Sequence, residues 1–63
     1  MKSFTIKYGE TVIAENVKAV CPQDALGKHH FDFFEPIYVN GDVAKQCDGN
    51  EVWVALPSEG GAK

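Results

Sequence analysis

The sequence has no arginine among its 63 residues, and this absence restricts the partners that the chain can have. Arginine is the residue best suited to bidentate contacts with phosphate groups and nucleobases. The six lysines are scattered along the chain, and the net charge is −3. Because binding to a nucleic-acid backbone depends on clustered positive charge, we expect no nucleic-acid partner.

Long hydrophobic runs are also missing. No apolar stretch approaches the roughly 20 residues of a membrane-spanning helix, and the first residues lack the apolar region of a signal peptide. We therefore expect no membrane association and a cytoplasmic location.

Cysteine is scarce, with only Cys21 and Cys47, and no C-x-x-C pair occurs. In a reducing compartment these two residues are expected to be free thiols.

The motifs of common enzyme sites are absent as well. The sequence contains no G-x-G-x-x-G, P-loop, G-x-S-x-G or H-x-x-x-H element. A composition of 44% apolar and 24% charged residues is nevertheless that of a globular domain. We expect one domain over residues 1–56 and a flexible C-terminal tail over residues 57–63. So small a domain leaves little room for a substrate pocket, so we expect no catalytic activity, no cofactor and no metal ion.

The first twenty residues predict a β-hairpin. Residues 3–8 alternate apolar and polar side chains, as in a half-buried strand. Residues 9–10 then suit a type II′ turn, because glycine comes first, and residues 11–20 return as the antiparallel partner. Glu15 falls among apolar residues in this register, so we expect a bulge near Glu15 and Asn16. The residues expected to face the core are Phe4, Ile6, Tyr8, Ile13, Val17 and Ala19.

Residues 22–34 are predicted to form a helix. Pro22 suits the first helical position, and Asp24 places a negative charge in the first turn. Pro36 ends the segment. Gly27 costs about 1 kcal/mol relative to alanine, so the helix has to dock on the sheet. The buried stripe is expected to hold Pro22, Ala25, Leu26, His29 and Phe33, with His30 at its shoulder and Phe31 pointing away.

The remaining residues predict three short strands joined by tight turns. Asn40-Gly41 and the D-G-N sequence at 48–50 are both strong hairpin signals. The whole chain therefore predicts an α+β fold, in which a β-hairpin, one helix and a second hairpin or three-stranded meander form a small antiparallel sheet with the helix packed on one face. The three predicted strands are residues 37–39, 42–47 and 51–56.

Side-chain size suggests which face of the later strands the helix covers. The larger aliphatic residues share one face, which we expect to be the core, and one helix leaves the other face open. The expected core set is Val43, Cys47, Val52, Val54 and Leu56. The expected open set is Val12, Ala14, Ala44, Trp53 and Ala55, flanked by Thr5, Lys7 and Lys18.

These features predict a small non-enzymatic protein–protein interaction domain. A tryptophan on a solvated face is typical of a binding surface, and Phe31 would be a second contact point on the helix. We expect the partner to be another protein, a second copy of the chain, or both, bound through the open face, an edge strand, or both. In size and style the chain resembles the small accessory or inhibitor proteins of phages and mobile elements. The predicted partner-binding residues are Trp53, Val12, Ala14, Ala44 and Phe31.

Two alternative functions use other residues. Cys21 precedes a predicted helix, a position that favours the reactive thiolate, and a histidine could serve as its base. The alternative is therefore a thiol- or metal-dependent site built from Cys21, His29, His30 and Cys47, although adjacent histidines on a helix diverge. A further alternative is an acidic decoy for a DNA-binding protein, which needs the carboxylates on one face.

Overall fold

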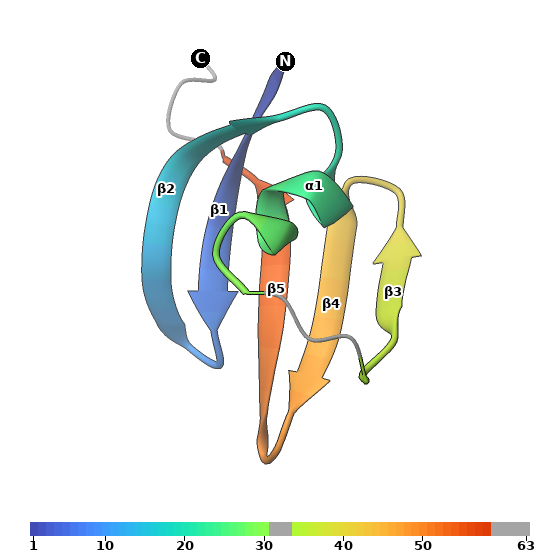
Figure 1. Ribbon diagram of the computed structural model, residues 1–63. Helices are drawn as coiled ribbons and strands as arrows, with labels where there is room; N and C mark the ends of the chain where they lie inside the picture. The colour runs from blue at the N-terminus through green and yellow to red at the C-terminus, as the bar shows by residue number, and fades with distance from the viewer. Residues whose placement is uncertain (31–33, 59–63) are drawn as a thin grey trace.

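The computed structural model describes residues 1–30 and 34–58, which form one five-stranded antiparallel sheet and one short helix (Figure 1). The strand order is β2-β1-β5-β4-β3, so the first and last strands meet at the centre of the sheet. The predicted antiparallel sheet and single helix are confirmed, but the domain is mainly β because the helix has only six residues. The elements are β1 (Lys2–Tyr8), β2 (Thr11–Ala19), α1 (Pro22–Gly27), β3 (Ile37–Asn40), β4 (Val43–Asp48) and β5 (Glu51–Pro57).

Three two-residue turns connect the strands, and each begins with a glycine. Gly9, Gly41 and Gly49 have φ angles of 62°, 63° and 63°. Within residues 1–30 and 34–58, the only non-glycine residue with a positive φ is Asn16. The second residue of each turn therefore has a negative φ, as a type II′ turn requires. The predicted turn at Gly9 is confirmed. The next turn consists of Gly41 and Asp42 and therefore begins one residue later than predicted.

The first bulge of β2 lies where the sequence predicts it. Phe4 pairs with Val17 instead of Glu15, and the register shifts between Phe4 and Ile6. Asn16 has a φ of 57°, a left-handed conformation that asparagine tolerates better than most residues. The extra residue lets Val17 join the core side while Glu15 stays exposed.

A second bulge in β2 was not predicted. Ile6 pairs with Ala14, but the next residue, Lys7, pairs with Val12, so Ile13 is the extra residue. Ala14 therefore packs against the core, whereas Ile13 is 45% exposed. The prediction that Ile13 faces the core was wrong, because it assumed an unbroken register from the turn onward.

Helix α1 ends much earlier than predicted. Ala25 and Leu26 are fully buried, as the predicted stripe requires, but the helix stops at Gly27. The backbone N–H groups of His29 and His30 both donate to the Leu26 carbonyl, at 3.0 and 2.9 Å, and close the last turn. Glycine is a poor helix former, and this local closure ends the helix there. The 3.6-residue period no longer applies beyond Gly27, so His29 is exposed and the prediction that it is buried was wrong.

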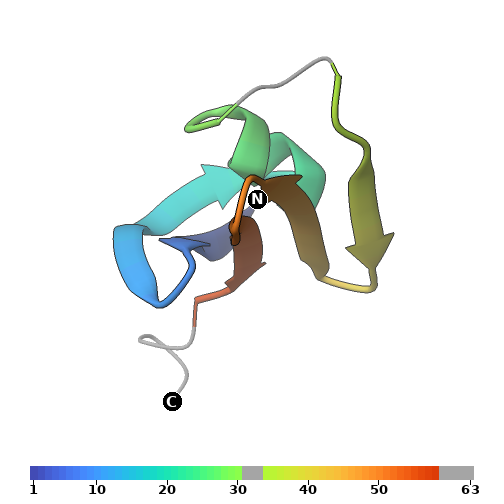
Figure 2. The same ribbon diagram turned by 90° about the horizontal axis from the view of Figure 1, so that it is seen from below.

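The core lies between α1 and one face of the sheet, which we call the covered face. Figure 2 shows the helix on that side. Ile6 pairs with both Ala14 and Ala55, and Ala44 pairs with both Ala55 and Val39, so a single row crosses all five strands. Three of these five residues are alanines, which leaves space for the helix. The fully buried apolar residues are Phe4, Ile6, Ala19, Ala25, Leu26, Ala44 and Ala55.

Strand β5 continues one residue past the predicted domain boundary at residue 56. Pro57 pairs with Phe4, and the Ser58 N–H donates to the Ser3 carbonyl at 2.9 Å. The predicted tail at residues 59–63 lies outside the described residues. The only helix in the described part of the chain has six residues, too few to cross a membrane.

Candidate functional site

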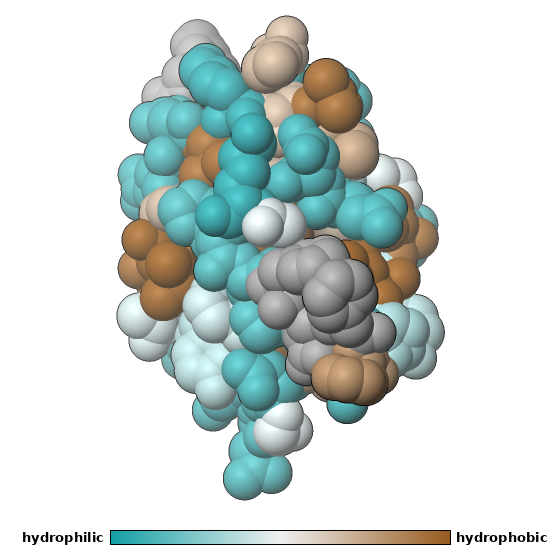
Figure 3. Space-filling model, in the orientation of Figure 1, coloured by the Kyte–Doolittle hydropathy of each residue, from teal (hydrophilic) through white to brown (hydrophobic). Residues whose placement is uncertain are grey.

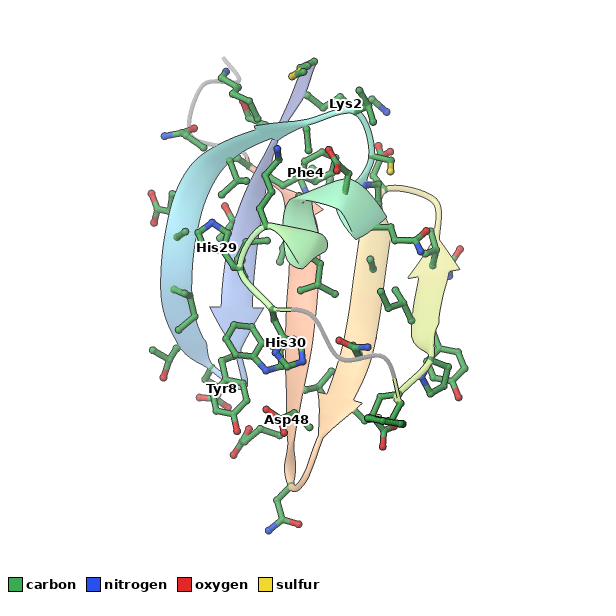
Figure 4. All side chains as sticks on the ribbon, in the orientation of Figure 1. Lys2, Phe4, Tyr8, His29, His30 and Asp48 are labelled. Carbon is green, nitrogen blue, oxygen red and sulfur yellow. The ribbon has the colours of Figure 1, made fainter. Side chains whose placement is uncertain are left out.

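Trp53 lies on the covered face and belongs to an aromatic cluster. Tyr8 is its neighbour on β1, with ring centroids 4.8 Å apart, and the His30 ring stacks on the indole at 4.6 Å with an interplanar angle of 8°. The indole Nε1–H donates to a carboxylate oxygen of Asp48 at 3.0 Å. In Figure 4, Tyr8, His30 and Asp48 gather below the helix, and His29 points elsewhere.

The prediction that Trp53 stands on an open face was therefore wrong. Trp53 shares its side of β5 with the fully buried Ala55, and it packs against the core cluster. The sequence interpretation placed the larger aliphatic residues inside and the alanines outside. The structure reverses this, because a helix can approach a sheet closely only where the strands carry small side chains.

The other predicted partner-binding residues have different surroundings. Ala44 is fully buried and Ala14 is partly buried against the core, so neither is available as an exposed contact. Their small side chains suit the close approach of α1 and not an outward surface. Val12 is 48% exposed on the opposite side of the sheet. Phe31 lies outside the described residues.

The uncovered side of the sheet, which we call the open face, carries the larger aliphatic side chains. Val54 pairs with Lys7 on one side and with Lys45 on the other. Lys7 pairs in turn with Val12, and Lys45 with Tyr38, so this row also spans all five strands. None of these five residues is fully buried. The open face consists of Thr5, Lys7, Val12, Tyr38, Asn40, Val43, Lys45, Cys47, Val52, Val54 and Leu56.

Positive charge is concentrated on this face although the chain is acidic. Lys7 and Lys45 flank Val54, and Lys18 lies beyond them, where its Nζ donates to the Ser3 hydroxyl at 2.8 Å. Lys2, in contrast, pairs with Asp42 at 3.0 Å at the end of the sheet. The open face is therefore an apolar surface crossed by lysines.

Four of the described carboxylates lie away from the open face, whereas Glu15 is exposed on β2 next to Ala14. Asp24 is in α1, Asp42 is in the turn before β4, and Asp48 and Glu51 flank the turn between β4 and β5. These described carboxylates do not form the single acidic face that the decoy hypothesis needs.

A surface depression of about 380 Å³ lies at one corner of the open face. It is lined by two cross-strand pairs, Tyr38 with Lys45 and Asn40 with Val43. These residues belong to β3 and β4, so the depression adjoins the β3 edge of the sheet. A side chain of a partner protein could fit into this depression.

The structure separates the residues of the alternative thiol or metal site. Cys47 is exposed on the open face, because it follows the fully buried Gln46 of the covered face. His30 stacks on Trp53 on the other side of the sheet, and Cys21 precedes α1. No three His, Cys, Asp or Glu side chains in residues 1–30 and 34–58 are placed to hold a metal ion.

Cys21 does line a depression of about 460 Å³ beside α1, but the base expected for it is not there. The other lining residues are Gln23, Asp24, Gly27, Lys28 and Ile37. Neither described histidine is among them. The pairing of Cys21 with a histidine base thus has no support in this geometry.

Sequence reasoning placed Lys7 beside the open face but missed Tyr38, Lys45 and Val54 as members of it. A signal was present, because Lys45 lies two residues after Val43 and so on the same face of β4, and charged side chains are rarely buried.

Comparisons with protein-family models, with curated proteins and with solved structures found no match to this chain.

Proposed function

We propose that the chain is a non-enzymatic protein-binding domain that uses its open face to bind a partner with an acidic and apolar surface. One observation carries this proposal. In β4 and β5, the larger aliphatic side chains point away from the helix, and alanines point toward it.

The energetic argument follows from side-chain size. Fully burying a valine or leucine side chain gains about 1.5–3 kcal/mol relative to leaving it exposed. On the open face Val43, Val52, Val54 and Leu56 are partly buried, so each keeps a minority of its surface exposed, and the corresponding part of this free energy is still available. Binding a partner protein would release it.

The lysines decide between kinds of partner. If two copies met open face to open face, Lys7 and Lys45 of each would approach like charges, which disfavours that pairing. An acidic surface complements the same lysines and accelerates association at low salt. A nucleic acid is the less favourable occupant, because the face carries four partly buried aliphatic residues and the chain has no arginine.

This function needs no cofactor, metal ion or catalytic group. A cytoplasmic location is consistent with Cys21 and Cys47, which are not joined in a disulfide. For so small a domain, we propose an accessory or inhibitor role, in which binding alone alters the partner's activity.

The two native cysteines allow a direct test, because they lie in different surroundings. A photo-crosslinker is attached to Cys47 in a Cys21→Ser background, or to Cys21 in a Cys47→Ser background. Each labelled protein is exposed to extract of the source cells and irradiated. We expect one acidic protein to crosslink through Cys47 and not through Cys21, as identified by mass spectrometry.

Charge reversal supplies the matched control. Lys45→Glu on the open face should abolish this crosslink, whereas Lys28→Glu beside α1 changes the net charge equally and should leave it intact. Crosslinking of equal yield from both cysteines, or equal yield from both charge variants, would rule out the open face as the binding surface.

A further inference from the structure

The two edge strands of the sheet are protected to different degrees. Strand β2 carries two bulges and the charged residues Glu15 and Lys18, features that hinder pairing with another strand. Strand β3 is regular and has no charged side chain between Ile37 and Asn40. Figure 3 shows hydrophobic surface at this margin of the molecule, where Val39 is 49% exposed. The β3 edge is therefore the one open to pairing.

The pairing within the hairpin determines which peptide groups of β3 are free. Asn40 and Val43 flank the two-residue turn and form the hydrogen-bonded pair that closes it. Hydrogen-bonded and non-hydrogen-bonded pairs alternate along an antiparallel ladder. The N–H and C=O groups of Ile37 and Val39 therefore point away from β4, toward the free edge of the sheet.

We propose that β3 pairs with β3 of a second copy of this chain, antiparallel and in a register centred on Tyr38. Ile37 of each copy would face Val39 of the other, and all four outward N–H and C=O groups at each copy would be satisfied. The two Tyr38 residues would lie directly opposite one another. Two five-stranded sheets would thereby become one continuous sheet.

The strand is self-complementary in this register. Ile–Val pairs on the covered side and a Tyr–Tyr pair on the open side are favourable cross-strand neighbours. Pro36 would face Asn40 of the second copy at a position where no N–H is needed, so its missing donor costs nothing. No charged residue lies within the paired segment.

The same geometry favours an edge-to-edge dimer through β3 over a dimer in which the two open faces meet. An antiparallel pair has its twofold axis perpendicular to the sheet, so both open faces lie on the same side and both remain free. The two Lys45 residues are three strand spacings apart, or about 14 Å, which exceeds a Debye length of about 10 Å at 0.1 M salt. This pairing goes beyond the proposed function, because of the open face it uses only Tyr38 and Asn40 at the β3 margin and leaves the strands β1, β4 and β5 of that face uncovered.

The expected dimer is weak. A four-residue strand buries less area than the roughly 1,000 Å² of a stable interface, so the dimer should depend on protein concentration. An engineered disulfide can capture such a dimer and also report its register.

The first experiment uses Tyr38→Cys in a Cys21→Ser, Cys47→Ser background. Opposed residues at a non-hydrogen-bonded antiparallel pair have Cα atoms about 4.5 Å apart, within the range of a disulfide. Val12→Cys in the same background is the control, since Val12 is 48% exposed and Tyr38 is 63% exposed. We expect mild oxidation to yield a covalent dimer of Tyr38→Cys at least ten times faster than of Val12→Cys. Equal rates, or no dimer from Tyr38→Cys, would overturn the pairing.

The second experiment places proline at an outward N–H. In sedimentation equilibrium, we expect the wild-type chain to show a concentration-dependent mass that approaches twice the monomer mass. Val39→Pro should remain monomeric, whereas Val12→Pro, at the equivalent position beside the first turn, should dimerise like the wild type. A wild-type chain that stays monomeric to millimolar concentration, or equal dimerisation by the two proline variants, contradicts the proposal.

The two proposals fail separately. If Val39→Pro does not fold, the disulfide comparison still decides the pairing. Crosslinking of the acidic partner through Cys47 should persist in a folded, monomeric Val39→Pro protein. Loss of the partner with retention of the dimer would reject only the proposed function.

Discussion

The two faces of the sheet are built from the same strands but from different kinds of side chain. The covered face presents Ala44 and Ala55 to the helix, and the open face carries Val43 and Val54, which are only partly buried. A protein that used its sheet only to form a core would favour the opposite arrangement. The difference indicates that side-chain volume at the covered face is limited by the helix, and the larger aliphatic residues form the face that we propose binds a partner.

The covered face makes up for its small residues with a few large ones. Phe4, Ile6 and Leu26 are fully buried and fill the space between the sheet and α1. Trp53 extends this face beyond the end of the helix, where His30 covers it. The stability of the domain therefore depends on few side chains, and the open face should contribute little to it.

The largest predicted difference in stability between the two faces is between two leucine-to-alanine variants. Leu26→Ala should lower the free energy of unfolding by about 2–5 kcal/mol, because Leu26 is fully buried. Leu56→Ala, the same deletion on the open face, should lower it clearly less, because Leu56 is only partly buried. Urea titrations of both variants would test this, and similar midpoints would show that the two faces are equally buried.

A volume change under the helix should have the next largest effect. Ala44→Val adds two methyl groups at a fully buried position of the covered face, and overpacking of this kind costs about 1–3 kcal/mol. Val43→Ala, one residue earlier on the open face, should have a much smaller effect. Thermal unfolding followed by circular dichroism would measure both. A neutral Ala44→Val would mean that the alanines are not required by the approach of α1.

The smallest predicted effect concerns the indole. Trp53→Phe keeps an aromatic ring against Tyr8 and His30 but removes the hydrogen bond to Asp48, so we expect a loss of about 1 kcal/mol. The same burial predicts blue-shifted tryptophan emission from a dilute, monomeric wild-type sample. Emission like that of free tryptophan in water, or an unchanged urea midpoint for Trp53→Phe, would instead place the indole outside the core.

Local signals in the sequence were sufficient for most of the architecture. Glycine at the first turn position, alternation in residues 3–8 and the misplaced Glu15 predicted the first hairpin, its turn and one of its bulges. Pro22, Ala25 and Leu26 identified the buried side of the helix correctly. These features depend on neighbouring residues, and therefore they can be inferred without the tertiary structure.

Features that depend on packing between elements were not predictable in this way. Period-2 alternation shows that Trp53 and Val54 lie on opposite faces, but it does not show which face the helix covers. That choice depends on which side chains fit beneath α1, and its one local signal was Lys45, which shares a face with Val43. The second bulge at Ile13 and the early end at Gly27 likewise arise from the way the hairpin and the helix fit the core. The candidate site was misplaced for the same reason.

The central pairing of β1 with β5 has a consequence for how the chain folds. Thr5 pairs with Leu56, so the middle of the sheet joins segments from nearly opposite ends of the sequence. Such pairing raises the contact order, and closing a long loop before any contact is gained slows folding. Neither the β1–β2 hairpin nor the β3–β4–β5 meander completes the core alone, so the domain should fold in a single late step, after β5 has been synthesised.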